Sequence, residues 1–250
     1  EQLVPWNLQL VELGVRMIRR RLDLLAFLVP QARRVHAFLT GEKGSFNVTY
    51  QNHGPYPSET YWEECVTPEK TGWSMESCCV VNNYLAGIRS TIEQMLRLTR
   101  ELDARDEPVV LVLFGDHKPW MGNGSSVYAE LGVSLDLSTQ EGFYNYFSTP
   151  YLIYANKAAK AALGQDFTGE GGDISPCFLM ERLFDACGWT GNRFMQLQRA
   201  TSAVSPLMHE DGYRMIDGVI TTDVEGTAVD VCERYLCAQY YREHHFTAAS

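Results

Sequence analysis

The chain has 250 residues, of which 45% are hydrophobic, and this is enough for one sizeable buried core. Lysine and arginine together number 21 against 31 aspartates and glutamates, which gives a formal net charge of -10. A surface that neutralises nucleic-acid phosphates is therefore not expected, so we predict no nucleic-acid partner. A phosphate substrate is still compatible with this charge, because one bound divalent cation can reverse the local field.

Apolar stretches are too short for a membrane-spanning helix, which needs ~20 residues. The longest candidate, residues 22–30, is short and directly follows three arginines. The chain also begins without a methionine and without a signal-peptide pattern, which is compatible with a part of a longer protein. We therefore expect any membrane association to depend on segments outside this sequence.

Seven cysteines occur at no spacing that is typical of a zinc site. Adjacent Cys78 and Cys79 are poor candidates for pairing with each other, since a disulfide needs a Cα separation that neighbours rarely reach. We predict buried or half-buried thiols, and the redox compartment stays open.

The pattern of the chain changes at about residue 44. Apolar residues recur at helical spacing from residue 8 to 39, with an interruption at Pro30. We therefore predict a helical segment over residues 1–44, whose role the sequence does not indicate, and a main domain over residues 45–250.

The main domain begins with a predicted strand at residues 45–50, where side chains alternate between polar and apolar. Asn52 and His53 follow it, and Gly54-Pro55 must end it. A histidine is thus expected at a strand end.

A long helix and a buried strand are predicted in the centre of the chain. Apolar residues on one face and charged residues on the other predict the helix over residues 78–102. The continuous apolar run at 108–114 is typical of a strand that is buried on both faces, as in parallel α/β sheets. This strand ends at a Gly-Asp-His motif, residues 115–117.

The elements beyond this motif continue the succession of helices and strands. In order, the sequence predicts a Gly-rich loop at 118–126, a buried strand at 151–154, an amphipathic helix at 175–187 closed by Gly188, a hairpin at 214–222 around Asp217-Gly218, and a final helix at 229–245. We therefore predict an α/β sandwich with a mostly parallel central sheet flanked by helices.

Asp116 and His117 are the best candidates for chemistry. Ligands of open α/β sheets bind at the carboxyl ends of strands, where this pair is expected to lie. A carboxylate and an imidazole offer one hard oxygen and one nitrogen donor to a divalent cation, and Gly115 before them allows a tight backbone path. The alternative is that Asp116 caps the following turn and that His117 is an ordinary surface histidine.

The run from Val109 to His117 resembles the strand and metal motif of the alkaline phosphatase superfamily, specifically of its sulfatase and lipoteichoic acid synthase branches. In the synthase family a histidine followed by a proline–aromatic pair precedes this motif at a similar separation, and here His53 precedes Asp116 by 63 positions. The resemblance covers residues 46–189. It implies the α/β fold of that superfamily, with the N-terminal portion of the domain missing from this chain.

The resemblance also implies roles for single residues. Asp116 and His117 would bind one divalent ion, manganese first, with magnesium or zinc as alternatives. His53 would contact the substrate phosphate or the leaving oxygen. The family's glutamate ligand and metal-bound threonine nucleophile would lie before Glu1, so that this chain holds only part of the site. Further candidates for substrate contact are Asn52, Tyr56, Lys118 and Trp120, although a solvated lysine and a packed tryptophan are alternatives for the last two.

The function that this resemblance implies is metal-dependent transfer of a phosphoglycerol or related phospho group through a covalent threonine intermediate. The substrate would be a phospholipid headgroup or a glycerophosphate-type compound, at the extracytoplasmic face of the cell membrane. A sulfatase or phosphodiesterase of the same superfamily is an alternative, because fold and metal pair do not fix the transferred group. A further alternative is a catalytically inactive fragment or binding module.

Overall fold

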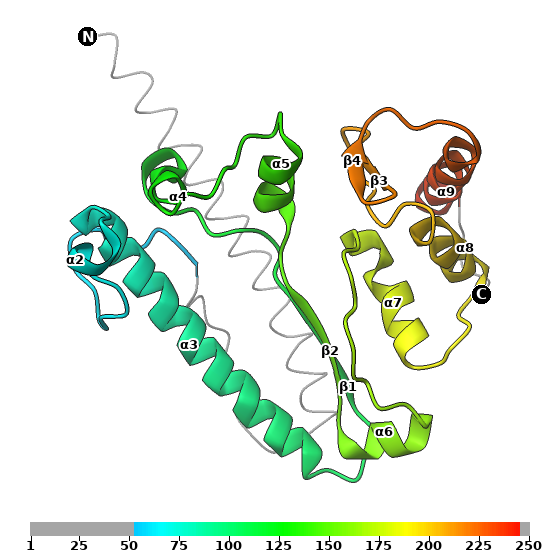
Figure 1. Ribbon diagram of the computed structural model, residues 1–250. Helices are drawn as coiled ribbons and strands as arrows, with labels where there is room; N and C mark the ends of the chain where they lie inside the picture. Colours follow the sequence, from blue (N-terminus) through cyan, green and yellow to red (C-terminus); the bar gives the residue numbers. More distant parts are fainter. Residues whose placement is uncertain (1–52, 246–250) are drawn as a thin grey trace. The chain divides into compact units, whose positions relative to one another are not determined.

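The computed structural model describes residues 53–245 (Figure 1). The predicted helical segment at 1–44, the predicted strand at 45–50 and Asn52 lie outside the described residues. Within the described part, helices predominate and the strands form two small antiparallel sheets.

The longest described element is helix α3 (Met75–Asp103), which follows the short helix α2 (Pro68–Thr71). Its N-cap is Ser74, whose side chain accepts a hydrogen bond from the backbone N–H of Ser77. Glu76 in the first turn also suits the positive end of the helix dipole. The predicted helix is confirmed, and it begins three residues earlier than its apolar periodicity indicates because the cap lies at Ser74.

Strands β1 (Val110–Phe114) and β2 (Tyr151–Ala155) pair antiparallel, with Phe114 opposite Tyr151. Both strands were predicted, but the predicted fold class was wrong. The described residues contain this two-stranded sheet and one small hairpin, and no mostly parallel central sheet.

The route of the chain between the two strands explains this correction. The connecting helices α4 (Ser126–Glu130) and α5 (Gln140–Phe147) lie at the end of the sheet where β1 finishes (Figure 1). A parallel pair needs a crossover that carries the chain back to the other end. Because these helices do not run back along the sheet, β2 returns beside β1 in the opposite direction.

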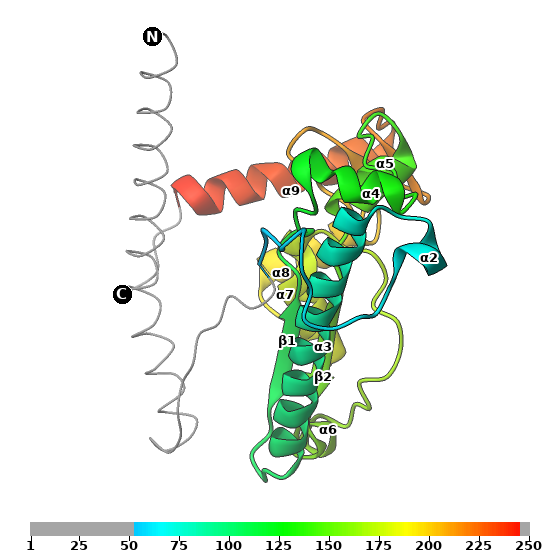
Figure 2. The same ribbon diagram turned by 90° about the vertical axis from the view of Figure 1, so that its left-hand side faces the viewer.

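The two strands are also less buried than expected for a strand covered on both faces. β1 is half-buried, and Phe114 at its end is 63% exposed. Helix α3 extends along the pair (Figure 2) and approaches it toward its own C-terminal end (Figure 1), where the Tyr154 hydroxyl donates to the Thr99 carbonyl oxygen at 3.2 Å. A sheet of two strands has few neighbours to cover its apolar side chains.

The remaining elements agree with the predicted order but include helices that were not predicted. The remaining elements are η1 (Asn123–Ser125), α6 (Lys157–Leu163), η2 (Pro176–Phe178), α7 (Leu179–Ala186), α8 (Arg193–Ser202), β3 (Arg214–Ile216), β4 (Val219–Thr221) and α9 (Thr227–His244). The amphipathic helix at 175–187, the hairpin at 214–222 and the final helix are confirmed, whereas α4, α5, α6 and α8 were not predicted. Asp217 and Gly218 both have positive φ, 49° and 80°, as a two-residue hairpin turn requires.

One apolar cluster lies directly beneath the loop that follows β1. It is formed by buried residues of α3, of α4 and of that loop, namely Val80, Val81, Met121, Val127 and Tyr128. Met121 is four positions after His117, so the loop that carries the Gly-Asp-His motif is anchored in this cluster.

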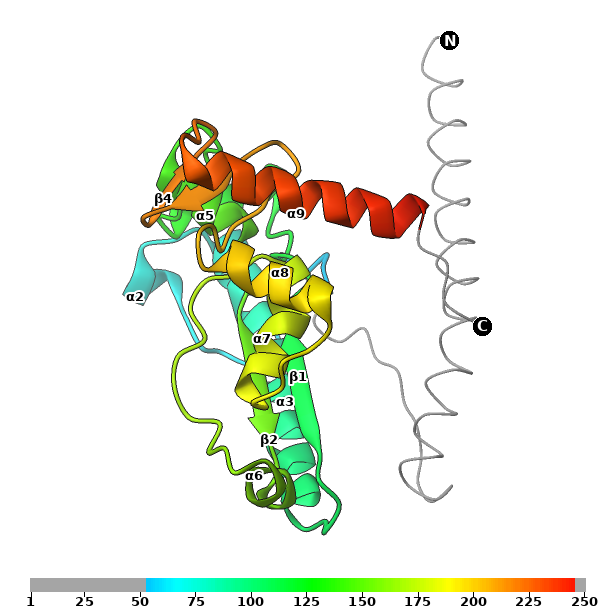
Figure 3. The same cartoon turned by 90° about the vertical axis from the view of Figure 1, so that its right-hand side faces the viewer.

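A second cluster joins the C-terminal helices. The Tyr235 ring of α9 lies 5.4 Å from that of Phe178 and 5.8 Å from that of Phe194, and α9 packs on α8 (Figure 3).

Among the described residues, no helix is long and apolar enough to cross a membrane.

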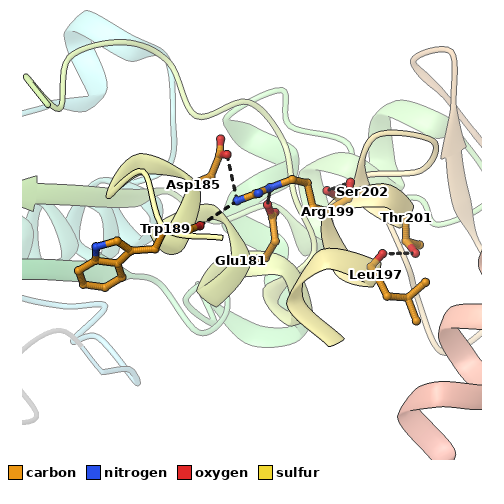
Figure 4. A network of polar contacts seen from close by, with 7 residues as sticks. All are labelled: Glu181, Asp185, Trp189, Leu197, Arg199, Thr201 and Ser202. Atoms are coloured by element: carbon orange, nitrogen blue, oxygen red, sulfur yellow. Dashed lines mark hydrogen bonds and ion pairs between the residues drawn. The ribbon is translucent and has the colours of Figure 1, made fainter. Parts of the chain in front are cut away.

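Helices α7 and α8 are tied by Arg199 (Figure 4). Its Nε donates to the Glu181 carboxylate at 2.9 Å, and its guanidinium also lies 3.1 Å from the Asp185 carboxylate. Glu181 is only 3% exposed. This ion pair is therefore largely removed from water on its acidic side, and loss of the arginine would leave a buried charge.

All seven cysteines are free thiols. Cys78, Cys79, Cys187 and Cys232 are buried, Cys65 and Cys177 are half-buried, and Cys237 is exposed. The predicted burial is therefore confirmed for six thiols and wrong for Cys237, in the middle of α9.

Candidate functional site

The Gly-Asp-His motif begins directly after β1. Gly115 donates its backbone N–H to the Pro150 carbonyl oxygen at 3.0 Å and accepts at its own carbonyl from the Thr149 hydroxyl at 2.7 Å. A Cβ at position 115 would lie 3.1 Å from the Thr149 Cβ. The glycine thus permits a close approach of the segment that precedes β2, which fixes the backbone where the candidate ligands begin.

Asp116 and His117 lie on the surface, with side chains 82% and 64% exposed. Asp116 Oδ2 is 3.6 Å from His117 Nε2, and Asp116 Oδ1 accepts from the His117 backbone N–H at 3.0 Å. His117 Nδ1 lies 2.8 Å from the Lys118 carbonyl oxygen. A carbonyl oxygen can only accept, so Nδ1 is the donor in this contact, and Nε2 is the ring nitrogen that lies near the carboxylate.

His53 lies beside this pair although it is 63 positions upstream of Asp116. Its ring is edge-on to the His117 ring, with centroids 6.3 Å apart and an interplanar angle of 90°. The structure thus brings together the three residues for which the resemblance implies metal or phosphate contacts. Their roles stay predictions.

Buried asparagines of α3 hold the segment that follows His53. Asn83 Nδ2 donates to the carbonyl oxygens of Pro57 at 3.0 Å and Thr60 at 2.7 Å. Asn82 Oδ1 accepts from the backbone N–H groups of Cys65 at 2.6 Å and Val66 at 2.9 Å. The sequence reasoning missed these positioning residues. The sequence signal for them is the pair of adjacent asparagines that directly follows the apolar residues 78–81. Polar side chains on a buried helix face need hydrogen-bond partners, so such a pair indicates contacts with another segment.

Tyr56 is half-buried rather than directed outward. Its ring lies 5.8 Å from the ring of Tyr84, and burial raises the pKa of Tyr56 to about 12. The side chain packs against the cluster that contains Tyr128, so it supports the loop after His53 from beneath.

Lys118 and Trp120 differ in what their side chains do. Lys118 Nζ donates to the Ser148 carbonyl oxygen at 2.9 Å, and partial burial lowers the pKa of this ammonium group. Lys118 therefore joins the motif loop to the end of α5. Trp120 is 61% exposed, so the alternative of a packed tryptophan is wrong.

The donors at this site match a divalent ion in kind but not in number. A carboxylate oxygen and an imidazole nitrogen at 3.6 Å are ligands that manganese, magnesium or zinc accept. Within the part of the chain that the structure describes, no group of three His, Cys, Asp or Glu side chains is placed to hold a metal ion. A complete shell around Asp116 and His117 would require further ligands, which their exposure leaves room to approach.

A cavity of about 520 Å³ lies elsewhere, between α5 and the β3–β4 hairpin. Glu141, Tyr144 and Asp173 contribute to its walls, and the Tyr144 hydroxyl donates to Asp173 at 3.0 Å. None of the predicted site residues lines it. We therefore assign the candidate chemistry to the exposed Asp116–His117 pair and not to this cavity.

No protein-family model matches the chain, and no solved structure matches it. Part of the chain is similar to the "Putative cyclic beta-1,2-glucan modification protein" of Rhizobium meliloti (strain 1021), with 25% identity over 150 residues. This match covers 58% of the chain and 22% of that protein, so the chain spans about a fifth of the length of this relative.

Two shorter similarities are to DNA replication and repair proteins RecF. The protein of Thermosynechococcus vestitus is 42% identical over 50 residues, which are 20% of this chain and 13% of that protein. The protein of a Synechococcus strain is 39% identical over 56 residues, which are 22% of this chain and 15% of that protein. The likeness to the Rhizobium protein thus extends over more of the chain than either RecF likeness.

Proposed function

We propose that this chain supplies a metal-binding aspartate and histidine to an enzyme that transfers a phosphoglycerol or a related phospho group. The observation that carries the proposal is the position of His53, whose ring lies 6.3 Å from that of His117. The three residues that the resemblance selects come from two distant parts of the chain and lie near one another, and this supports a common site.

Each of the three residues has a distinct part in the proposed reaction. Asp116 Oδ2 and His117 Nε2 would hold the divalent ion, for which manganese is the first choice. Such an ion, when bound, stabilises negative charge on phosphoryl oxygens. His53 contacts the phosphate or donates a proton to the departing oxygen. We assign no residue of this chain as the nucleophile.

The proposed donor is a phospholipid headgroup or another glycerophosphate-type compound, at the extracytoplasmic face of the membrane. The name of the Rhizobium protein states that a cyclic β-1,2-glucan is modified, which supports a glucan as the acceptor here. The RecF similarities concern about a fifth of this chain and 13% or 15% of those proteins, too little to carry their activity over.

Titration with manganese tests the metal-binding part of the proposal. We would titrate Mn²⁺ into the 250-residue chain and follow free Mn²⁺ by electron paramagnetic resonance. The variants Asp116→Asn and His117→Gln should each weaken binding by more than about tenfold, because changes even in outer-shell partners of metal ligands cost that much. The control is Asp106→Asn, an exposed carboxylate at the opposite end of β1, which should bind as the wild type does. Equal affinity in all four proteins would contradict the assignment.

Transfer itself is tested in the natural protein that carries this chain. The variant Asp116→Ala should abolish transfer of labelled glycerol phosphate from phosphatidylglycerol, since a metal ligand and the groups that it serves act as a unit. Retained transfer would show that the reaction does not use this aspartate.

A further inference from the structure

Trp120 presents its indole to solvent from a backbone that is held on both sides. The Pro119 carbonyl oxygen accepts from the Tyr128 hydroxyl at 2.8 Å, and Met121 is 3% exposed within the apolar cluster beneath the loop. Trp120 is 61% exposed, so most of its large apolar ring lacks the stabilisation that burial would give. An aromatic side chain on a fixed backbone loses little entropy when it binds a ligand.

The backbone of Trp120 lies beside the candidate site. Trp120 is three positions after His117, and its carbonyl oxygen lies against Gly54, where a Cβ would come within 3.2 Å of it. Gly54 directly follows His53. The loop that carries His53 and the loop that carries the metal pair therefore meet at Trp120.

We propose that Trp120 is the platform on which a glucose ring of the acceptor glucan stacks. This inference rests on the proposed function, from which the glucan acceptor is taken. A glucopyranose ring has one apolar face of C–H groups and a rim of hydroxyls, while indole offers a flat apolar face and one N–H donor. Because the backbone of Trp120 lies three positions after His117 and against Gly54, a sugar stacked on its ring would be held near the proposed site, with its hydroxyls free to accept the transferred group.

The charge of the chain favours a sugar over a lipid surface as the ligand of Trp120. Membrane-surface binding by an exposed tryptophan is usually supported by basic residues that attract anionic headgroups. The chain carries a net charge of -10, and the adjacent Lys118 already donates to Ser148. A net negative charge would repel an anionic lipid surface, but it does not repel a neutral glucan.

Titration with unsubstituted cyclic β-1,2-glucan tests the proposal. We would measure its affinity for the full 250-residue chain by calorimetry and by tryptophan fluorescence. Trp120→Ala should weaken binding by about tenfold or more, as for a buried aromatic anchor, and Trp120→Phe should retain part of the affinity because an aromatic face remains. The matched control is Trp62→Ala, which removes a 78% exposed tryptophan from the loop before α2 and should change nothing.

Three outcomes would overturn the platform: no binding of the glucan by the wild-type chain, equal affinity in Trp120→Ala, or an equal loss in Trp62→Ala. Binding of phosphatidylglycerol vesicles through Trp120 without binding of the glucan would overturn it as well. Thermal melting of Trp120→Ala should match the wild type, because the ring contributes little packing.

The variant Asp116→Asn separates this inference from the proposed function. It should bind the glucan as the wild type does, since stacking on Trp120 needs no metal, while it loses affinity for Mn²⁺. If Asp116→Asn binds Mn²⁺ as the wild type does and Trp120→Ala loses glucan binding, the metal pair is rejected while the proposed role of Trp120 is supported.

Discussion

Single buried amides organise much of the described structure, and Asn156 is the clearest case. Its side chain is fully buried. Oδ1 accepts from the backbone N–H groups of Val109 at 3.0 Å and Ala159 at 2.9 Å, while Nδ2 donates to the carbonyl oxygens of Leu102 at 2.8 Å and Glu107 at 2.9 Å. One residue thus joins the end of α3, the approach to β1 and the N-terminus of α6.

The substitution Asn156→Ala should lower the free energy of unfolding by about 3 kcal/mol, because buried donors and acceptors of the backbone would lose their partners. Urea unfolding followed by circular dichroism measures this. The control is Asn192→Ala, which removes the N-cap of α8 at an exposed position and should cost about 1 kcal/mol. Equal losses in the two variants would show that burial of Asn156 adds nothing to its capping role.

At the scale of elements, the contact between α7 and α8 depends on one partly exposed arginine and one buried glutamate. The Arg199 side chain is 39% exposed, whereas that of Glu181 is 4% exposed. Removal of Arg199 would leave the Glu181 carboxylate buried without its charge partner, which is costly, whereas replacement of both residues by apolar ones avoids the buried charge.

The variant Arg199→Met should therefore lower the free energy of unfolding by about 3 kcal/mol. The double variant Glu181→Met with Arg199→Met should be more stable than this single variant, because no unpaired charge remains. Guanidinium unfolding of the three proteins provides the comparison. A double variant that is less stable than Arg199→Met would show that the unpaired Glu181 carboxylate is not what destabilises the single variant.

At the scale of the whole molecule, buried phenols make stability depend on alkaline pH. Burial raises the pKa of Tyr56, Tyr128 and Tyr154 to about 12 each. In the unfolded chain these groups titrate near 10. Between about pH 10 and 12 the unfolded chain therefore binds fewer protons than the native chain, so the free energy of unfolding falls as pH rises through this window.

Urea unfolding at a series of pH values should thus show constant tyrosine-dependent stability up to about pH 10 and a decline above it. Absorbance of phenolate should increase together with loss of helical circular dichroism. Tyr56→Phe should make the decline less steep, because it removes one of the groups that titrate on unfolding. An identical slope in the variant would show that Tyr56 does not contribute to the alkaline transition.

Local structure was predictable where its signals lie within contiguous segments. The periodicity of α3, the amphipathic pattern of α7 and the Asp217-Gly218 turn each depend on neighbours in sequence. Helices α6 and α8 escaped prediction because they start at asparagine caps that composition alone did not distinguish from loop residues.

The arrangement of the sheet was not predictable from the strands themselves. Continuous apolar runs identified β1 and β2, but such a run does not indicate the direction of its partner. That direction depends on where the connecting segment places α4 and α5, and both lie at the end of the sheet where β1 finishes (Figure 1).

The sequence by itself determined that Asp116 and His117 are adjacent donors after a strand, since covalent order guarantees it. Only the tertiary structure decided that His53 lies beside them, that Lys118 is engaged with Ser148 and that Trp120 remains exposed. These features depend on non-local contacts, in which α3 holds the loop after His53 and the apolar cluster anchors the loop after β1. Pairings between distant segments follow from packing of the whole unit, and local sequence patterns do not encode them.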